Sequence, residues 1–231
     1  MKTDFHSLTE RLERVYTPRV AFRHLALADA WPLYDATRDP RFNLGLMWDQ
    51  PGDDTAVLAR VDAIVSAARR GLLTAVSAVM KGTGEWISLY RFQPYSADPR
   101  LVEMGIWTHK KFWHGQFSLE LARACIDAAF SVTDIPLLIG AAYPTNPRSC
   151  KLLELCGLSP TKVVSRRKES GVEVELQEFE VHRAQWASAR RAPEFSEVAV
   201  RAPAYPVPSP EGNSPTNTGL ALQREAAEHL T

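Results

Sequence analysis

The sequence predicts an α/β domain: a mixed, mostly antiparallel sheet of about seven strands, with helices on both faces. Three observations support this fold class. Residues 101–108 read as a strand that leads into an amphipathic helix at 117–130. Residues 72–80 and 85–92 have the pattern of two hairpin strands around a Gly-rich turn. Residues 136–141 are wholly apolar, which is typical of a strand buried on both faces.

The composition is that of one globular domain with appendages. The chain has 231 residues, 45% hydrophobic and 23% charged, and 27 Lys and Arg balance 27 Asp and Glu. This balance predicts no nucleic-acid partner. No apolar run reaches the ~20 residues of a membrane helix, and the N-terminus has no signal-peptide pattern, so we expect no membrane partner and a cytoplasmic location. The scattered histidines and cysteines have no metal-site spacing, so we expect no metal.

The elements before the first hairpin alternate between helix and strand. Residues 1–16 form a predicted helical extension, 17–23 a strand, and 28–37 a helix that ends before Asp39-Pro40. Residues 55–70 form a second long helix, with N-cap chemistry before it and a glycine after it.

The loop at 41–54 is unusually apolar. Its large apolar side chains are Phe42, Leu44, Leu46, Met47 and Trp48. They either wall a ligand pocket, as exposed aromatic groups often do, or cap the core.

The elements after the apolar strand complete the domain. Residues 146–157 form a predicted helix, 159–165 and 172–181 a final hairpin, and 184–191 a last short helix. Proline, serine and asparagine then crowd the chain, so residues 191–231 are a predicted Pro-rich, disordered tail. The expected organisation is therefore an extension at 1–16, a domain at 17–190 and this tail.

The turn at 109–116 joins the strand 101–108 to its helix. The first N–H groups of a helix lack intrahelical partners and lie at the positive end of its dipole. Such a helix start binds phosphate or diphosphate groups, and Lys110 or Lys111 could add positive charge. The alternative is a solvated basic turn.

This stretch resembles the first motif of the GNAT superfamily, the acyl-CoA-dependent N-acyltransferases. The most similar branch contains the ribosomal-protein alanine N-acetyltransferases. The paired glycines of that branch fall on His114 and Gln116, and the only glycine of the turn, Gly115, lies between them. The residues that match are Glu103-Met104-Gly105-Ile106-Trp107, Trp113, Glu120 and Phe130.

A second motif follows at the family's separation. Residues 146–158 resemble the family's second motif at Asn146, Ser149, Gly157 and the apolar Leu158. Asn146 suits a helix N-cap, and Gly157 suits the C-terminal cap of the same helix. Two motifs in order are far more specific than one glycine pattern.

The resemblance implies the GNAT fold and an enzyme that moves an acetyl group from acetyl-CoA directly to a primary amine in a ternary complex. The acceptor would be a protein N-terminus or a small molecule, and the protein a monomer or homodimer. By resemblance, the diphosphate would bind near the turn, and the pantetheine arm would pair with the strand backbone. The implied cofactor-binding residues are Ile106, Trp107, Thr108, Lys111, His114, Gly115, Gln116, Phe117, Ser118 and Asn146.

Two side chains are candidate catalysts. Glu103 is the expected general base, directly or through water, although it could be an ordinary strand carboxylate. Ser149 could hydrogen-bond the CoA sulfur or relay a proton to it. Asn146 either bonds the pantetheine arm or only caps its helix.

Two other functions stay open. Glycine favours close approach of backbone to a diphosphate, so its absence at 114 and 116 is compatible with a binding or scaffold protein with weakened CoA binding. An apolar loop at 41–48 could instead enlarge the pocket for a longer acyl donor.

Overall fold

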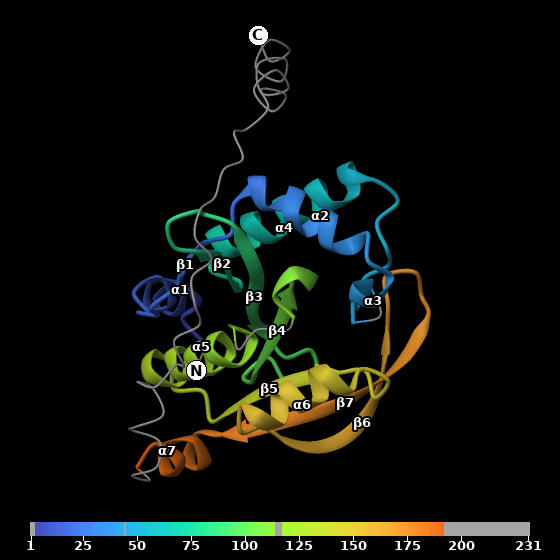
Figure 1. Ribbon diagram of the computed structural model, residues 1–231. Coiled ribbons are helices and arrows are strands. Elements are labelled where there is room, and N and C mark those ends of the chain that lie inside the picture. The colour runs from blue at the N-terminus through green and yellow to red at the C-terminus, as the bar shows by residue number, and fades with distance from the viewer. Residues whose placement is uncertain (1–2, 44, 114–116, 192–231) are drawn as a thin grey trace. The chain divides into compact units, whose positions relative to one another are not determined.

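The computed structural model describes residues 3–43, 45–113 and 117–191. Within these residues, seven strands form one sheet in the order β1-β2-β3-β4-β5-β7-β6 (Figure 1). Only β4 and β5 run parallel, and every other neighbouring pair is antiparallel. The predicted fold class is thereby confirmed. The strands are β1 (Val20–His24), β2 (Thr74–Met80), β3 (Trp86–Pro94), β4 (Val102–Thr108), β5 (Leu137–Ala142), β6 (Ser159–Arg167) and β7 (Glu173–His182).

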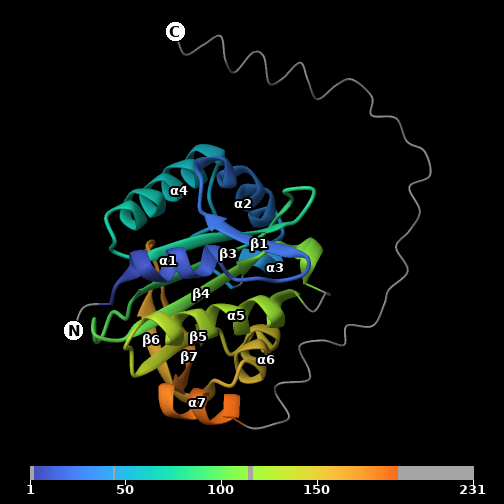
Figure 2. The ribbon, with the colours of Figure 1, turned by 90° about the vertical axis from the view of Figure 1, so that its left-hand side faces the viewer.

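Helices cover both faces of the sheet (Figure 2). One hydrophobic cluster joins the sheet to α1 and α5, and a second joins it to α2 and α4. Two single-turn segments, η1 (Leu27–Asp29) and η2 (Lys110–Phe112), complete the described part of the chain. The helices are α1 (Phe5–Glu13), α2 (Ala30–Thr37), α3 (Pro40–Asn43), α4 (Asp54–Arg69), α5 (Phe117–Val132), α6 (Pro147–Leu155) and α7 (Arg183–Arg191).

Local sequence signals account for several boundaries. The Asp53 carboxylate accepts a hydrogen bond from the Ala56 amide at 2.9 Å and so caps α4. Gly71 follows the end of α4 with φ +68°, a conformation that side chains with a Cβ rarely adopt. These two residues explain why the predicted bounds of α4, 55–70, agree with the structure to within one residue.

The N-terminal helix is part of the main core. Leu8 and Leu12 are fully buried, in the same cluster as the side chains of α5. The apolar side chains of α1 therefore face the sheet and α5.

The loop between α2 and α4 packs into the second core. Phe42, Leu46 and Trp48 are all buried there, so these side chains cap the core, and Trp48 in addition stacks on Trp107 of β4. The short helix α3 was not predicted, and Leu44 lies outside the described residues.

Candidate active site

The parallel strands β4 and β5 separate part-way along their length. They pair only from Val102 to Met104, opposite Leu138 to Gly140. Burial along β4 changes at the same point: Val102 to Met104 are buried, whereas the residues from Gly105 to Thr108 are half-buried. The second half of β4 therefore has an edge that no strand covers.

The backbone of β4 presents alternate residues to this open edge. In an antiparallel pair, hydrogen-bonded and non-hydrogen-bonded residues alternate. The His109 amide donates to the Ile87 carbonyl at 2.9 Å, and the register places Trp107 opposite Leu89. The backbone N–H and C=O groups of Trp107 thus bond to β3, while those of Ile106 and Thr108 face the opening. The Thr108 carbonyl already accepts from Trp113 Nε1 at 2.7 Å.

The start of α5 lies just after this strand. By helix geometry, the N–H groups of Phe117 and Ser118 have no intrahelical partner. Lys111 forms an exposed ion pair with Glu85, a contact of low strength that a phosphate can replace. His114, Gly115 and Gln116 lie outside the described residues.

Arg19 is a cation at the start of α5 that the sequence reading missed. Its guanidinium carbon lies 4.2 Å from the Phe117 ring centroid, and its Nη2 lies 3.2 Å from a carboxylate oxygen of Glu120. Arg19 precedes β1, about 100 residues away in sequence, so no local motif points to it.

The start of α6 occupies the other lip of the opening, at the carboxyl end of β5. Asn146 Oδ1 accepts from the Ser149 amide at 3.2 Å, so Asn146 is the N-cap that the sequence predicts. The half-buried Ser149 hydroxyl makes no hydrogen bond within the described residues. Beside them, the Tyr143 hydroxyl donates to the Leu46 carbonyl at 3.0 Å and ties the α3–α4 loop to this lip.

Glu103 belongs to a buried ion network. Its Oε1 accepts from Arg166 Nη1 at 2.6 Å, and Arg166 Nη2 also donates to Glu178 at 2.8 Å. The Tyr95 hydroxyl donates to the same Glu178 oxygen at 2.7 Å. Glu103 is 8% exposed. One of its oxygens is therefore committed to a guanidinium, and a solvated strand carboxylate does not describe it.

Aromatic and cationic groups form the wall of the opening on the side opposite α5. Trp48 and Trp107 are stacked, with centroids 5.4 Å apart and an interplanar angle of 16°. Arg60 lies over Trp48 at 4.7 Å, and Arg91 lies over Trp107 at 4.9 Å. A Cβ at Gly105 would come within 2.7 Å of the Trp107 ring, so the glycine of the first motif makes room for this ring.

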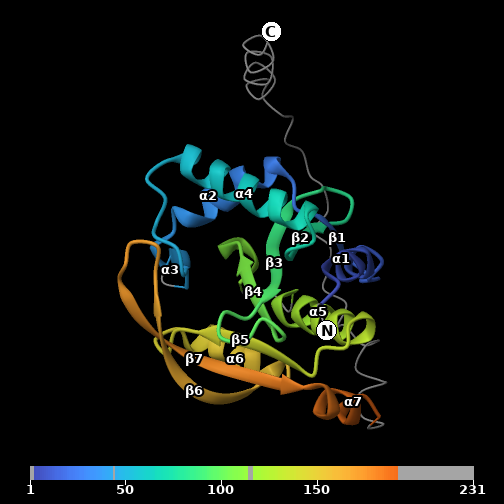
Figure 3. The ribbon, with the colours of Figure 1, turned by 180° about the vertical axis from the view of Figure 1, so that it is seen from behind.

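The β6–β7 hairpin reaches the α3–α4 region (Figure 3). Its tip is fixed there because Ser170 Oγ and N each contact an Asp49 carboxylate oxygen at 2.8 Å. Arg60 forms a bidentate pair with Glu169 in the same tip. The hairpin thus bounds the wall that Trp48 and Trp107 form.

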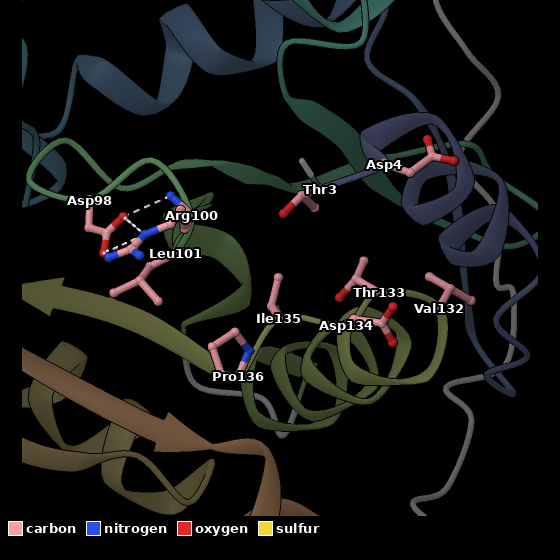
Figure 4. Close-up of a pocket in the computed structure, with 10 residues that line it drawn as sticks. All are labelled: Thr3, Asp4, Asp98, Arg100, Leu101, Val132, Thr133, Asp134, Ile135 and Pro136. Atoms are coloured by element: carbon pink, nitrogen blue, oxygen red, sulfur yellow. Dashed lines mark hydrogen bonds and ion pairs between the residues drawn. The ribbon is translucent and has the colours of Figure 1, made fainter. Parts of the chain in front are cut away.

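A pocket also lies near the amino ends of β4 and β5, away from the opening (Figure 4). It contains the Asp98–Arg100 ion pair, in which hydrogen bonds from Arg100 lower the pKa of Asp98 to about 2. None of the predicted site residues lines it. Among the described residues, no group of three or more potential ligands is placed to hold a metal ion, and no helix is long and apolar enough to cross a membrane.

A family model described as an acetyltransferase (GNAT) domain matches residues 19–159, more than half of the chain. The chain belongs to the GNAT acetyltransferase family. This membership identifies it as an enzyme of the acetyl-CoA-dependent N-acetyltransferase class. It also confirms the GNAT fold that the two motifs implied.

Solved GNAT structures have the same architecture. A putative ribosomal-protein-serine acetyltransferase from Vibrio cholerae is 15% identical with a TM-score of 0.64, over 73% of this chain and 96% of that one. A GNAT-family acetyltransferase from Bacillus anthracis is 13% identical with a TM-score of 0.63, over 74% and 98%. Spermidine N-acetyltransferase from Vibrio cholerae is 11% identical with a TM-score of 0.61, over 74% and 99%. No curated protein sequence gave a match.

Proposed function

We propose that this GNAT enzyme binds acetyl-CoA between β4 and β5 and transfers the acetyl group to a primary amine. The observation that carries the proposal is the uncovered edge of β4 beside the starts of α5 and α6. The pantetheine arm pairs with Ile106 and Thr108, and the diphosphate lies at Phe117 and Ser118, near Lys111 and Arg19. A crevice at the carboxyl ends of parallel strands is the usual ligand site of an α/β sheet.

Two structures of similar fold support this donor. Spermidine N-acetyltransferase from Vibrio cholerae was solved with CoA and spermine, and the microcin C7 self-immunity acetyltransferase with acetyl-CoA and AMP. Both proteins are below 15% identical to this chain. They therefore support the binding of CoA by a protein of this fold, but they indicate no particular acceptor.

The reaction is a direct transfer in a ternary complex. The amine nitrogen attacks the thioester carbonyl carbon, the C–S bond breaks, and the thiolate leaves with the bonding electron pair. The nitrogen loses one proton and the thiolate gains one. Holding both reactants beside the free edge of β4 supplies the proximity, and the Ile106 or Thr108 N–H polarises the carbonyl oxygen.

We assign the proton transfers to the two predicted side chains. Glu103 lies on the wall opposite α5, and its Oε2, which has only a long 3.4 Å contact from Gln93, accepts the amine proton through a water molecule. The Ser149 hydroxyl hydrogen-bonds the sulfur from the α6 lip. Asn146 keeps its Oδ1 in the helix cap and can still donate from Nδ2 to the pantetheine arm.

The acceptor is a primary amine of a small molecule or of a protein N-terminus. We infer acetyl as the transferred group, since Phe42, Leu46 and Trp48 are packed in the core and do not enlarge a pocket for a longer chain. A cytoplasmic location and a monomeric or homodimeric state remain predictions.

A thermal-shift series tests the donor. Acetyl-CoA and CoA should raise the melting temperature by mass action, and long acyl-CoAs should raise it less. An amine screen that detects released thiol then tests transfer. A protein with no shift for any coenzyme and no thiol release would be a binding or scaffold protein with weakened CoA binding, contrary to the proposal.

A further inference from the structure

Arg91 is a cation on the wall of the proposed active site that forms no direct ion pair within the described residues. It is half-buried, and its guanidinium carbon lies 4.9 Å from the centroid of the Trp107 ring. Within the described residues, no carboxylate pairs with it and no acceptor takes a hydrogen bond from it. Its binding capacity for an anion is therefore unused.

The other two arginines of this wall differ in that respect. Arg60 is held by both carboxylate oxygens of Glu169. Arg166 is shared between Glu103 and Glu178. Each of these guanidinium groups has a protein carboxylate in direct contact that offsets its loss of water, whereas Arg91 contacts the face of an aromatic ring and feels Glu103 and Glu169 only at longer range.

Burial also affects the Arg91 charge directly. Loss of solvent lowers the pKa of its guanidinium, while the nearby Glu103 carboxylate acts in the opposite direction. The group stays charged at neutral pH, since arginine titrates far above it. A partly desolvated charge of this kind is stabilised when a ligand brings a carboxylate.

The register places Arg91 beside the site of transfer. Arg91 lies opposite Gly105 across β3 and β4, and Gly105 precedes Ile106, whose backbone faces the opening. One strand spacing of about 4.8 Å and one residue of about 3.3 Å thus separate the Arg91 backbone from that of Ile106. A molecule of a few bonds' length can reach from the thioester to the guanidinium.

The shape of the guanidinium indicates which anion suits this site. Its carbon lies over the Trp107 ring, and its N–H groups donate no hydrogen bond within the described residues, so they are the binding surface. Two parallel N–H donors match the two oxygens of a carboxylate.

We propose that Arg91 binds a carboxylate of the acceptor, so that the enzyme prefers amines carrying a carboxylate a few bonds from the reacting nitrogen. This inference rests on the proposed function, because it places the acceptor on the Trp107 side of the β4–β5 opening. Amino acids and peptides with an acidic first residue share this chemistry, and paired probes distinguish them.

The test compares acceptors that differ only in the carboxylate. The probes are alanine against alaninamide, and Glu-Ala-Ala-amide against Gln-Ala-Ala-amide. Thiol release gives kcat and KM for each with wild type, Arg91→Met, Arg91→Lys and Arg70→Met. Arg70 is an exposed arginine at the end of α4, so its replacement is a control for the change in net charge. Comparing the ratio within each pair across variants cancels the intrinsic reactivity of the amines.

We expect wild type to prefer the carboxylated member of at least one pair. Arg91→Met should reduce that preference about ten- to hundredfold, mainly through KM, since it removes a hydrogen bond between charged groups. Arg91→Lys should keep part of the preference, and Arg70→Met all of it. Titration of the CoA-saturated protein with the preferred acceptor should change tryptophan fluorescence in wild type, with weaker binding in Arg91→Met.

Equal preference in wild type and Arg91→Met would overturn the inference and leave the transferase function intact. So would a protein that binds acetyl-CoA but neither binds nor acetylates any of the four probes. A protein that gives no thermal shift with acetyl-CoA would overturn the proposed function as well, which distinguishes the two failures.

Discussion

At the residue scale, Arg166 balances the charge of two buried carboxylates on the site wall. It extends from β6 to Glu103 on β4, across the intervening strands β7 and β5, and also holds Glu178. Both carboxylates are buried, at 8% and 0% exposure. Removing one member of such a network leaves buried charge without compensation.

We therefore predict that Arg166→Leu lowers the free energy of unfolding by about 3–5 kcal/mol. The neighbouring Arg167 is a matched control, because its pair with Glu173 is exposed on both sides. Arg167→Leu should cost at most about 1 kcal/mol. Urea denaturation of both variants measures the difference. Equal losses of unfolding free energy would contradict a special contribution of the network to stability.

Tyr95 makes the stability of this network sensitive to alkaline pH. Burial, followed by the hydrogen bond to Glu178, raises the pKa of Tyr95 to about 12, from 10.0. A raised pKa means that the folded state favours the protonated phenol, so this contribution is complete below pH 10 and is lost as pH rises toward 12.

The stability advantage of wild type over Tyr95→Phe should accordingly shrink between pH 10 and pH 12. Urea denaturation at several pH values in this range gives the two stabilities. Burial also raises the pKa of Tyr90 and Tyr143, so the variant should keep part of the alkaline slope. A constant gap between the two proteins would contradict the assignment to Tyr95.

At the scale of elements, the start of α6 gives the Asn146 side chain two roles that mutations can separate. The Asn146 side chain caps the helix through Oδ1, and the pantetheine contact would use Nδ2. We predict that Asn146→Ala costs about 1 kcal/mol of stability and also raises KM for acetyl-CoA.

Asn146→Asp restores the capping oxygen without restoring the amide donor. Its stability should return to near that of wild type, while KM for acetyl-CoA should stay high. Thermal denaturation and steady-state kinetics on the same three proteins decide the point. A variant that recovers both properties would limit Asn146 to capping.

The elements were predictable where their signals are local. The apolar strand β5, the cap of α6 and the strand–turn–helix of β4 and α5 each follow from residues adjacent in sequence. The partners of Glu103 and Trp107 were not predictable, because Arg166 and Trp48 reach them from distant strands and loops. The pairing of the long β6–β7 hairpin with β5 and the packing of the α3–α4 loop bring these groups together in the fold.

At the scale of the whole domain, the N-terminal helix is part of the fold. Leu8 is fully buried between the sheet and α5. We predict that Leu8→Ala lowers the free energy of unfolding by about 2–5 kcal/mol. The exposed Leu27 is a control of the same type, since Leu27→Ala should change stability by less than about 0.5 kcal/mol. A small effect at Leu8 in urea denaturation would mean that the helix is a dispensable appendage.

The central claim is that the open edge of β4 holds the coenzyme thioester. Hydrogen–deuterium exchange with and without acetyl-CoA tests it most directly, because exchange reports protection of backbone amides. The claim predicts slower exchange at the amides of Ile106 and Thr108 and in the first turn of α5 when acetyl-CoA is bound. Unchanged exchange at these positions in a protein saturated with acetyl-CoA would contradict it.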